Sequence, residues 1–183
     1  MNDYYSWFDA TIDEIKRGNK EIEKALASLN RLICRTEHGR SQRDFSVKGF
    51  QLLYGRAVAH GSAPYKTEPM YLRGYCMSPA VLFAKSGQSL SLYLGLQLHK
   101  GKMDGVVRWP FQHSFRLSVV HPQEFTKRQL EFKPSPSCEL TRRPTETSNE
   151  PFYHSEGSLN LFDLVRDGYV HQDQLRMTLE LIL

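Results

Sequence analysis

The side chains of this sequence that are most able to do chemistry are its seven histidines and three cysteines. Both types bind transition metals, and a neighbouring Cys–His pair can supply an activated nucleophile. Such sites need a close and regular spacing, as in Cys-x-x-Cys or His-Glu-x-x-His, and neither pattern occurs here. The residues are His38, His60, His99, His113, His121, His154, His171, Cys34, Cys76 and Cys138. Their spacing predicts no metal site and no cofactor.

Two further patterns are open to a catalytic interpretation, and each also has a simpler one. Cys138 and His154 could meet in the fold, but cysteines of intracellular proteins are more often packing or surface thiols. The run from Gly101 to Gly105 (GKMDG) lacks the spacing and the following helix of a phosphate-binding loop, and a hairpin turn explains it. We therefore expect a chain that is not an enzyme.

Composition narrows the classes of partner and compartment. The formal net charge is only +4, and the basic residues are scattered apart from Arg142-Arg143, so no nucleic-acid partner is expected. No apolar run is long enough to span a bilayer, which predicts no direct membrane insertion. Three widely spaced cysteines and the lack of a signal-peptide pattern favour a reducing compartment, the cytoplasm. The length of 183 residues allows one domain plus an appendage.

The N-terminal region carries a heptad pattern. Apolar residues alternate at spacings of four and three, which is typical of a helix that buries a narrow seam against other helices. The seam is Phe8, Ile12, Ile15, Asn19, Ile22, Leu26, Leu29 and Ile33. We predict a helix over residues 4–37, roughly 50 Å long at 1.5 Å per residue, within a coiled-coil oligomerisation segment spanning 1–38.

The residues of the seam favour a trimer. Ile15 and Ile22 occupy d positions and Leu26 occupies an a position, which shifts the preference from two strands towards three or four. Asn19 at an a position fixes register in either a dimer or a trimer, so the choice between the two stays open. An alternative is an amphipathic helix that folds back on the rest of its own chain.

The remainder of the chain, residues 39–183, is predicted to be β-structure without a helical period. Strand-length apolar runs alternate with turn signals, as in Leu90–Leu98 and in Phe115, Leu117 and Val119. Several strands without intervening helices indicate an antiparallel sandwich. The expected strands are Phe45–Tyr54, Cys76–Phe83, Leu90–Leu98, Phe111–Val120, Leu130–Lys133 and Gln174–Leu183.

A series of short motifs follows in a fixed order along this β-region. They are GYCM at 74–77, LSLYL at 90–94, RWPF at 108–111, FKP at 132–134, RRP at 142–144, PFYH at 151–154 and YVHQD at 169–173. The series resembles the C-terminal MATH domain of the TNF-receptor-associated factors, the TRAF family, which a coiled coil also precedes. RWPF at this distance from an LSL strand is the most specific of the motifs.

The resemblance implies a mainly β fold, an eight-stranded antiparallel TRAF-like sandwich presented as a trimer by its coiled coil. Family members are cytoplasmic signalling adaptors, and their partners are receptor cytoplasmic tails or peptides of other signalling proteins. Full-length members usually carry an upstream RING module for ubiquitin transfer, and no such zinc element lies in this sequence.

The resemblance also indicates where the family's peptide groove would lie, at an edge strand to which a receptor tail adds. In many members an Arg-x-Tyr pair and an Asp hold a polar peptide group, and here those positions are Ala80, Leu82 and Ser86. The family's run of serines is replaced by Cys138, Glu139 and Leu140. The apolar floor is kept by Tyr93 and Leu117. The candidate peptide-binding residues are Ala80, Leu82, Ser86, Tyr93, Leu117, Cys138, Glu139 and Leu140.

The groove implied by these residues keeps its apolar character and loses its polar specificity groups. Each buried peptide amide left without a partner would cost roughly 1–3 kcal/mol, so we expect a ligand other than the usual Gln-containing motif. A more apolar or basic peptide suits Leu82, Leu140 and Glu139. Two alternatives remain, a MATH substrate adaptor of a ubiquitin-ligase assembly and a pure oligomerisation module.

Overall fold

The computed structural model describes residues 3–38, 40–135 and 137–182, and the side chains of all of these except 3–10, 27 and 30–38. The chain divides into two compact units, Met1–Glu37 and His38–Leu183, which are described separately. Within the described residues, no helix is both long enough and apolar enough to cross a membrane.

The described residues of the first unit all lie in one continuous helix, α1 (Asp3–His38). The seam residues Ile12, Ile15, Ile22, Leu26 and Leu29 have between 45% and 59% of their surface exposed. Asn19 is also exposed, and the side chains of Phe8 and Ile33 lie outside the described residues. The predicted helix is therefore present, while its association with other copies stays a prediction.

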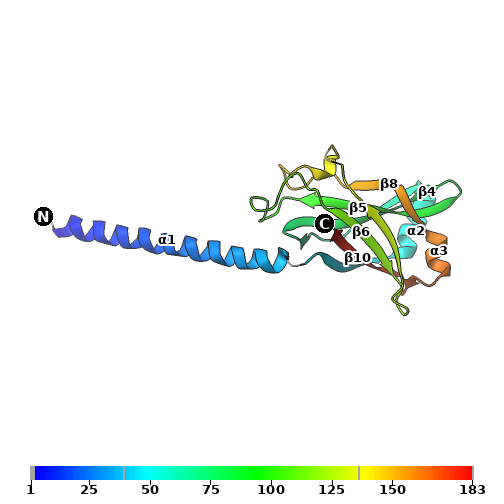
Figure 1. The fold of residues 1–183 in the computed structure, drawn as a ribbon, viewed down its shortest axis with the longest axis horizontal. Helices are drawn as coiled ribbons and strands as arrows, with labels where there is room; N and C mark the ends of the chain where they lie inside the picture. The colour runs from blue at the N-terminus through cyan, green and yellow to red at the C-terminus, as the bar shows by residue number, and fades with distance from the viewer. Residues whose placement is uncertain (1–2, 39, 136, 183) are drawn as a thin grey trace. The chain divides into compact units, whose positions relative to one another are not determined.

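The second unit is a sandwich of two antiparallel sheets (Figure 1). The strands of sheet A, in spatial order, are β1 (Gln42–Lys48), β10 (Gln174–Ile182), β6 (Ser114–Val120) and β7 (Lys127–Phe132), with short β9 (Val170–His171) beside β10. Those of sheet B are β2 (Ser62–Lys66), β4 (Tyr75–Ser86), β5 (Ser89–His99) and β8 (Phe152–Asn160), with short β3 (Met70–Leu72) beside β4. Over the described residues, the two main paths hold eight strands, which confirms the predicted fold class.

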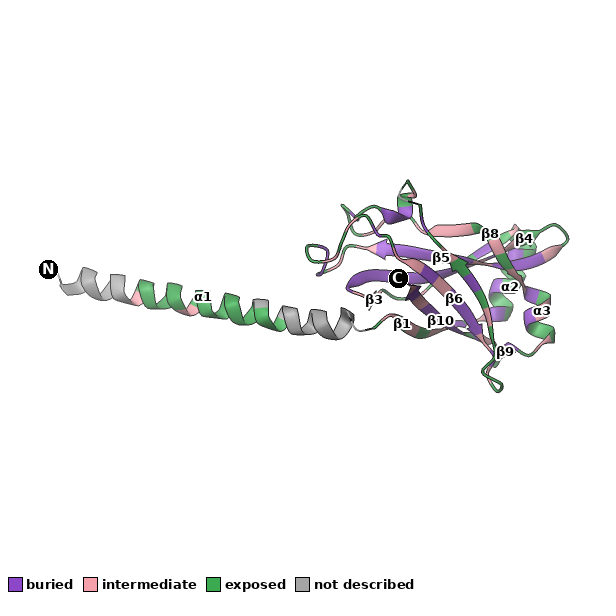
Figure 2. Ribbon diagram, viewed as in Figure 1, coloured by how far each residue is buried: buried purple, intermediate pink, exposed green. Residues whose placement is uncertain are grey.

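The core lies between the sheets because the apolar residues alternate along each strand. In β5 the residues Leu92, Leu94, Leu96 and Leu98 are completely buried. The matching residues Phe115, Leu117 and Val119 of β6 are at most 1% exposed. Figure 2 shows buried residues in purple along the strands of both sheets.

The prediction that no helix follows Gly39 was wrong. The expected strand Phe45–Tyr54 ends as β1 at Lys48, and α2 (Phe50–His60) begins two residues later. Gly49 has φ +71° at this junction, a left-handed conformation that glycine adopts easily. The buried residues Phe50, Leu53 and Ala57 have helical spacing and face the core.

Two shorter helical segments also lie in the second unit, η1 (Glu139–Thr141) and α3 (Leu161–Arg166). The predictions located β4, β5, β6, β7 and β10 but not β2, β3, β8 and β9. Their boundaries also differ, since β6 begins at Ser114 and β7 begins at Lys127. The segment before β6 is irregular, although Phe111 is buried there beside Tyr75, with ring centroids 5.0 Å apart.

Candidate functional site

The two sheets each end in a strand with a free edge, and these two strands lie together. In the described sheets, β7 pairs only with β6, and β8 pairs only with β5. The ring of Phe132 on β7 lies 4.8 Å from that of Phe152 and 4.5 Å from that of His154, both on β8. We call these two strands the β7–β8 edge. Unpaired backbone groups on such an edge can bind an additional strand.

The β8 strand is irregular where it passes β5. Tyr93 is paired with Ser158, but Gly95 is paired with Tyr153, so residues 154–157 form a bulge. A Cβ atom at Gly95 would lie 2.6 Å from the Tyr153 ring and 3.0 Å from the Ala80 Cβ atom. Only glycine therefore lets the Tyr153 ring cover this part of sheet B. The bulge redirects the side chains that follow it along the edge.

A surface depression of about 260 Å³ lies where β8 begins. Its lining combines apolar and charged groups from η1, the following loop and β8 itself. The lining residues are Glu139, Leu140, Arg142, Asn149, Glu150, Pro151 and Phe152. An extended peptide placed along β8 would reach this depression at one end.

Hydrogen bonds from sheet B hold the loop that forms this depression. The Gln97 side-chain amide donates to the Ser148 hydroxyl at 3.0 Å and to the Asn149 carbonyl at 2.7 Å. The Asn149 amide then donates to the Arg142 carbonyl at 2.7 Å. Gln97 is 6% exposed, and its oxygen accepts a hydrogen bond from the Lys66 ammonium at 2.7 Å. The loop that forms the depression is therefore held by the buried Gln97 amide, whose nitrogen and oxygen both form hydrogen bonds.

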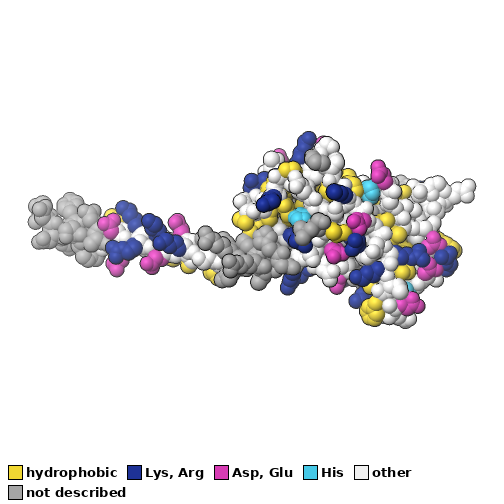
Figure 3. Space-filling view, viewed as in Figure 1, with side chains coloured by type: hydrophobic (Ala, Val, Ile, Leu, Met, Phe, Trp, Pro, Cys, Tyr) yellow, Lys and Arg dark blue, Asp and Glu magenta, His cyan; other side chains and the backbone are white. Residues whose placement is uncertain are grey.

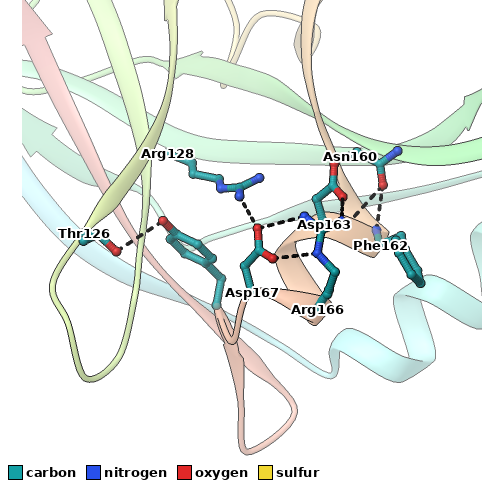
Figure 4. Close-up of polar contacts among 8 residues, drawn as sticks. Thr126, Arg128, Asn160, Phe162, Asp163, Arg166 and Asp167 are labelled. Carbon is teal, nitrogen blue, oxygen red and sulfur yellow. Dashed lines mark hydrogen bonds and ion pairs between the residues drawn. The ribbon is translucent and has the colours of Figure 1, made fainter.

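The opposite end of β8 leads into α3 through a polar network (Figure 4). Asn160 caps this helix, because its side-chain oxygen accepts from the Phe162 backbone N–H at 2.8 Å. The Asp167 carboxylate accepts a hydrogen bond from the Arg166 guanidinium at 2.7 Å and also forms an ion pair with Arg128 of β7. The hydrogen bond from Arg166 lowers the pKa of the Asp167 carboxyl below its ordinary value. This network joins the start of β7 to the end of β8.

The structure brings some of the predicted site residues together at β8. Glu139 and Leu140 line the depression, although the Leu140 side chain is only 2% exposed. Leu82 is paired with Tyr93, and Tyr93 is paired in turn with Ser158 of β8. Leu82 and Tyr93 are both half-buried and lie on the outer face of sheet B.

The other predicted site residues lie elsewhere or are covered. Ala80 is fully buried and lies under the Tyr153 ring, while Leu117 is 1% exposed and belongs to the core. Cys138 is half-buried and packs against the core. Ser86 is exposed at the end of β4, in the last pair before the turn to β5. Ala80 and Leu117 are therefore too deeply buried for their side chains to contact a ligand.

Sequence reasoning missed three polar side chains near the edge. Tyr153 lies within the PFYH motif but carries no pattern that distinguishes it from a core aromatic, and burial raises the pKa of its hydroxyl. Ser135 and Ser137 are exposed, and their hydroxyl oxygens lie 2.9 Å apart. These serines stand just before the positions assigned to the family's hydroxyl groups, so a search of the whole 133–144 loop would have found them.

The chemistry of this edge is that of noncovalent recognition. It offers backbone donors and acceptors, aromatic surface, serine hydroxyls and a few charged groups. Within the described part of the chain, no cluster of three or more His, Cys, Asp or Glu side chains has a geometry suited to a metal ion. Burial raises the pKa of the Cys76 thiol, which disfavours its nucleophilic thiolate form.

Comparisons with known proteins agree with this architecture. Residues 57–178 match the family described as TRAF/meprin, MATH domain. TNF receptor-associated factor 6-A of Xenopus laevis is 25% identical over 178 residues, an alignment covering 90% of this chain but 30% of that protein. The solved structure of Notothenia coriiceps TRAF5 superimposes with a TM-score of 0.60 at 19% identity, covering 98% of this chain and 94% of that chain.

Proposed function

This chain belongs to the TRAF/meprin MATH domain family, a family of protein-interaction modules, and we propose that it is a trimeric cytoplasmic adaptor that binds short peptides by strand addition to β8. The proposed division of labour is a coiled-coil segment at 1–38 and a peptide-binding MATH sandwich at 39–183. The peptides would come from receptor tails or other signalling proteins. The single observation that carries this proposal is the free edge of β8 beside a preformed depression.

The position of β8 supports strand addition over binding to a closed pocket. Its outer edge has no strand partner among the described residues, and its pairing with β5 already fixes its backbone. A peptide strand would extend sheet B by backbone hydrogen bonds, and side-chain contacts would supply specificity. Tyr93 and Leu82 lie in one row that crosses sheet B from Ser158, near the end of β8, and the depression lies at the start of β8 near Phe152.

The side chains around the edge suit a peptide that is apolar with a basic group. The depression carries Glu139 and Glu150 against a single cation, Arg142. Leu82 and Tyr93 offer apolar surface at the other end. A basic peptide side chain near the two carboxylates would gain charge complementarity, which contributes more to specificity and association rate than to affinity.

Multivalency would make individually weak sites useful. The exposed apolar seam of α1 supports self-association, because three copies would bury it. A trimer would hold three β8 edges, and linked binding sites raise avidity by about 10²–10⁴-fold when their spacing matches the partner.

A peptide-array screen followed by titration in solution tests the peptide-binding claim. The full chain is expected to bind apolar peptides that carry one Lys or Arg, and Tyr93→Ala should weaken binding of the best peptide at least about fivefold. Leu52→Ala is the matched control, since Leu52 is an exposed apolar residue on α2, 68% exposed, and should leave affinity unchanged. Binding of Gln-containing acidic peptides alone, or equal loss in both variants, would contradict the proposal.

A further inference from the structure

The outer face of sheet A sorts its side chains into rows that follow from strand register. One row is Gln42, Glu180, Arg116 and Glu131, and the next is Asp44, Thr178, Ser118 and Gln129. The third row is Ser46, Arg176, Val120 and Lys127, and the last pair is Lys48 and Gln174. Residues directly opposite one another across strands share a face, so each row crosses the sheet on the side away from the core.

Charge is separated along this face. The first two rows contain three acids and one cation, and that cation, Arg116, lies 2.9 Å from Glu131 and 3.2 Å from Glu180. The Asp44 carboxylate accepts a hydrogen bond from the Thr178 hydroxyl at 2.6 Å. The last two rows contain Lys48, Arg176 and Lys127 and no acid. The three cations are exposed, and none has an ion pair within the described residues.

A depression of about 500 Å³ extends over the first three rows, from Gln42 and Asp44 to Arg176. Arg176 and Lys127 line it together with the apolar residues Val120 and Phe125. Phe125 is 66% exposed at the turn between β6 and β7, and its φ of +58° is rare for a residue with a side chain. Figure 3 shows both basic and acidic side chains beside the apolar tip of this turn. Asp44 is the one acid among the residues that line the depression, against the two cations Arg176 and Lys127.

We propose that the cationic end of this face is a second binding surface, for an acidic peptide segment. Arg176 and Lys127 are two strands apart, with Val120 between them, a separation of about 10 Å. Alternate side chains of an extended peptide point to the same face, so two carboxylates four residues apart, about 13 Å along the chain, would both face the two long cationic side chains. An apolar side chain between them would pack on Val120 and Phe125, whose exposure the bound segment would reduce.

The surface differs from the proposed peptide site at β8 in position and in charge. Arg176 lies on β10, an inner strand of sheet A, so no strand can add beside it. The depression at the start of β8 has the opposite balance, with Glu139 and Glu150 against Arg142. An acidic segment is therefore expected to avoid the β8 edge and to occupy sheet A. The inference does not depend on strand addition at β8.

Fluorescence anisotropy of the full chain tests this assignment. The probe is a labelled ten-residue peptide with two glutamates four residues apart and a phenylalanine midway between them, so that all three side chains share one face of the extended chain. Arg176→Glu and Lys127→Glu should each weaken its binding about tenfold or more, and affinity should fall as salt rises. Lys85→Glu is the matched control, because Lys85 is an exposed cation on sheet B and should change affinity less than twofold.

Two further measurements separate the alternatives. A peptide with glutamines in place of the glutamates should bind at least tenfold more weakly, and equal binding would overturn the proposal. Binding to phosphatidylserine vesicles without binding to the peptide would identify a membrane surface instead and would also overturn it. If Arg176→Glu lowers the unfolding temperature, Arg176→Gln and Lys127→Gln replace the charge reversals, and unchanged affinity in both folded variants would refute the assignment.

Discussion

Helix α1 and the β-sandwich use the same apolar residue types in opposite environments. Leu26 and Leu29 on the helix are each 55% exposed, whereas Leu92 and Leu94 on β5 are fully buried. The sandwich buries its apolar face within one chain, because two sheets pack face to face. A single helix has no second layer of its own. The sandwich therefore supplies its own core, while the seam of α1 is exposed in the single chain.

The strongest way to test this comparison is to remove the seam without touching the sandwich. In the Ile15→Asp/Ile22→Asp variant, carboxylates would occupy two buried positions of the proposed coil, at a cost that association cannot offset. We expect binding to a surface-clustered peptide to fall about a hundredfold or more, while affinity for the free peptide stays unchanged. Surface plasmon resonance and solution titration measure the two quantities.

Ser28→Asp is the control for the seam variant. Ser28 is exposed and lies outside the heptad seam, so an aspartate placed there should preserve clustered binding. Equal losses in both variants would show that added charge, and not the seam, explains the effect.

The sandwich side of the comparison is tested by truncating a buried ring. Phe83 is fully buried and lies 5.4 Å from the Phe50 ring, whereas Phe162 is 66% exposed. Phe83→Ala should lower the free energy of unfolding by about 3–5 kcal/mol, and Phe162→Ala by less than about 1 kcal/mol. Urea denaturation measures both. Similar costs would mean that the sheets do not form the main core.

A smaller effect is expected at the cap that ends β8. Asn160→Ala removes the acceptor for the Phe162 N–H and should destabilise the second unit by about 1 kcal/mol. Asn160→Asp keeps an acceptor and should retain most of that stability. The thermal unfolding temperatures of the two variants check this, and identical losses would exclude capping as the cause.

The smallest expected effect is a pH dependence of the sandwich. Burial lowers the pKa of His99 and His113, so the unfolded chain binds protons more readily than the folded one. Stability should be complete above the ordinary histidine pKa of about 6.5 and should fall as pH drops through the lower folded values. Denaturation at pH 7.5 and 5.5 measures this fall.

Replacement of these histidines distinguishes their contribution from general acid sensitivity. His99→Gln keeps a hydrogen-bonding group for the Ser78 hydroxyl, 2.8 Å away, and should reduce the difference between the two pH values. His171→Gln, at an exposed position, should leave that difference unchanged. A difference unaffected by His99→Gln and His113→Gln together would contradict the assignment.

The sequence predicted the parts of the fold in which one physical pattern dominates. Alternation in β5 and β6 located inner strands, since every second residue must enter the core. It did not locate α2, because the run Phe50–Tyr54 is apolar enough to be read as a strand, and only the spacing to Ala57 is helical. It did not locate β8, an edge strand of mostly half-buried and exposed residues with a bulge.

The candidate site was less predictable than the fold because its positions depend on contacts between distant segments. The cover over Ala80 comes from Tyr153, and it is possible only because Gly95 leaves room between them. Local sequence does not show which side chain fills such a space. Glu139 and Leu140 were named from the loop that carries them, but the depression they line also needs the Gln97 hydrogen bonds.

The proposed multivalent mechanism depends most directly on whether α1 assembles the chain. Sedimentation equilibrium of the full chain at micromolar concentration, beside the Ile15→Asp/Ile22→Asp variant, measures this. A mass three times that of the 21.2 kDa chain, falling to one chain in the variant, is the predicted result. A monomeric full chain would contradict the proposed multivalent mechanism.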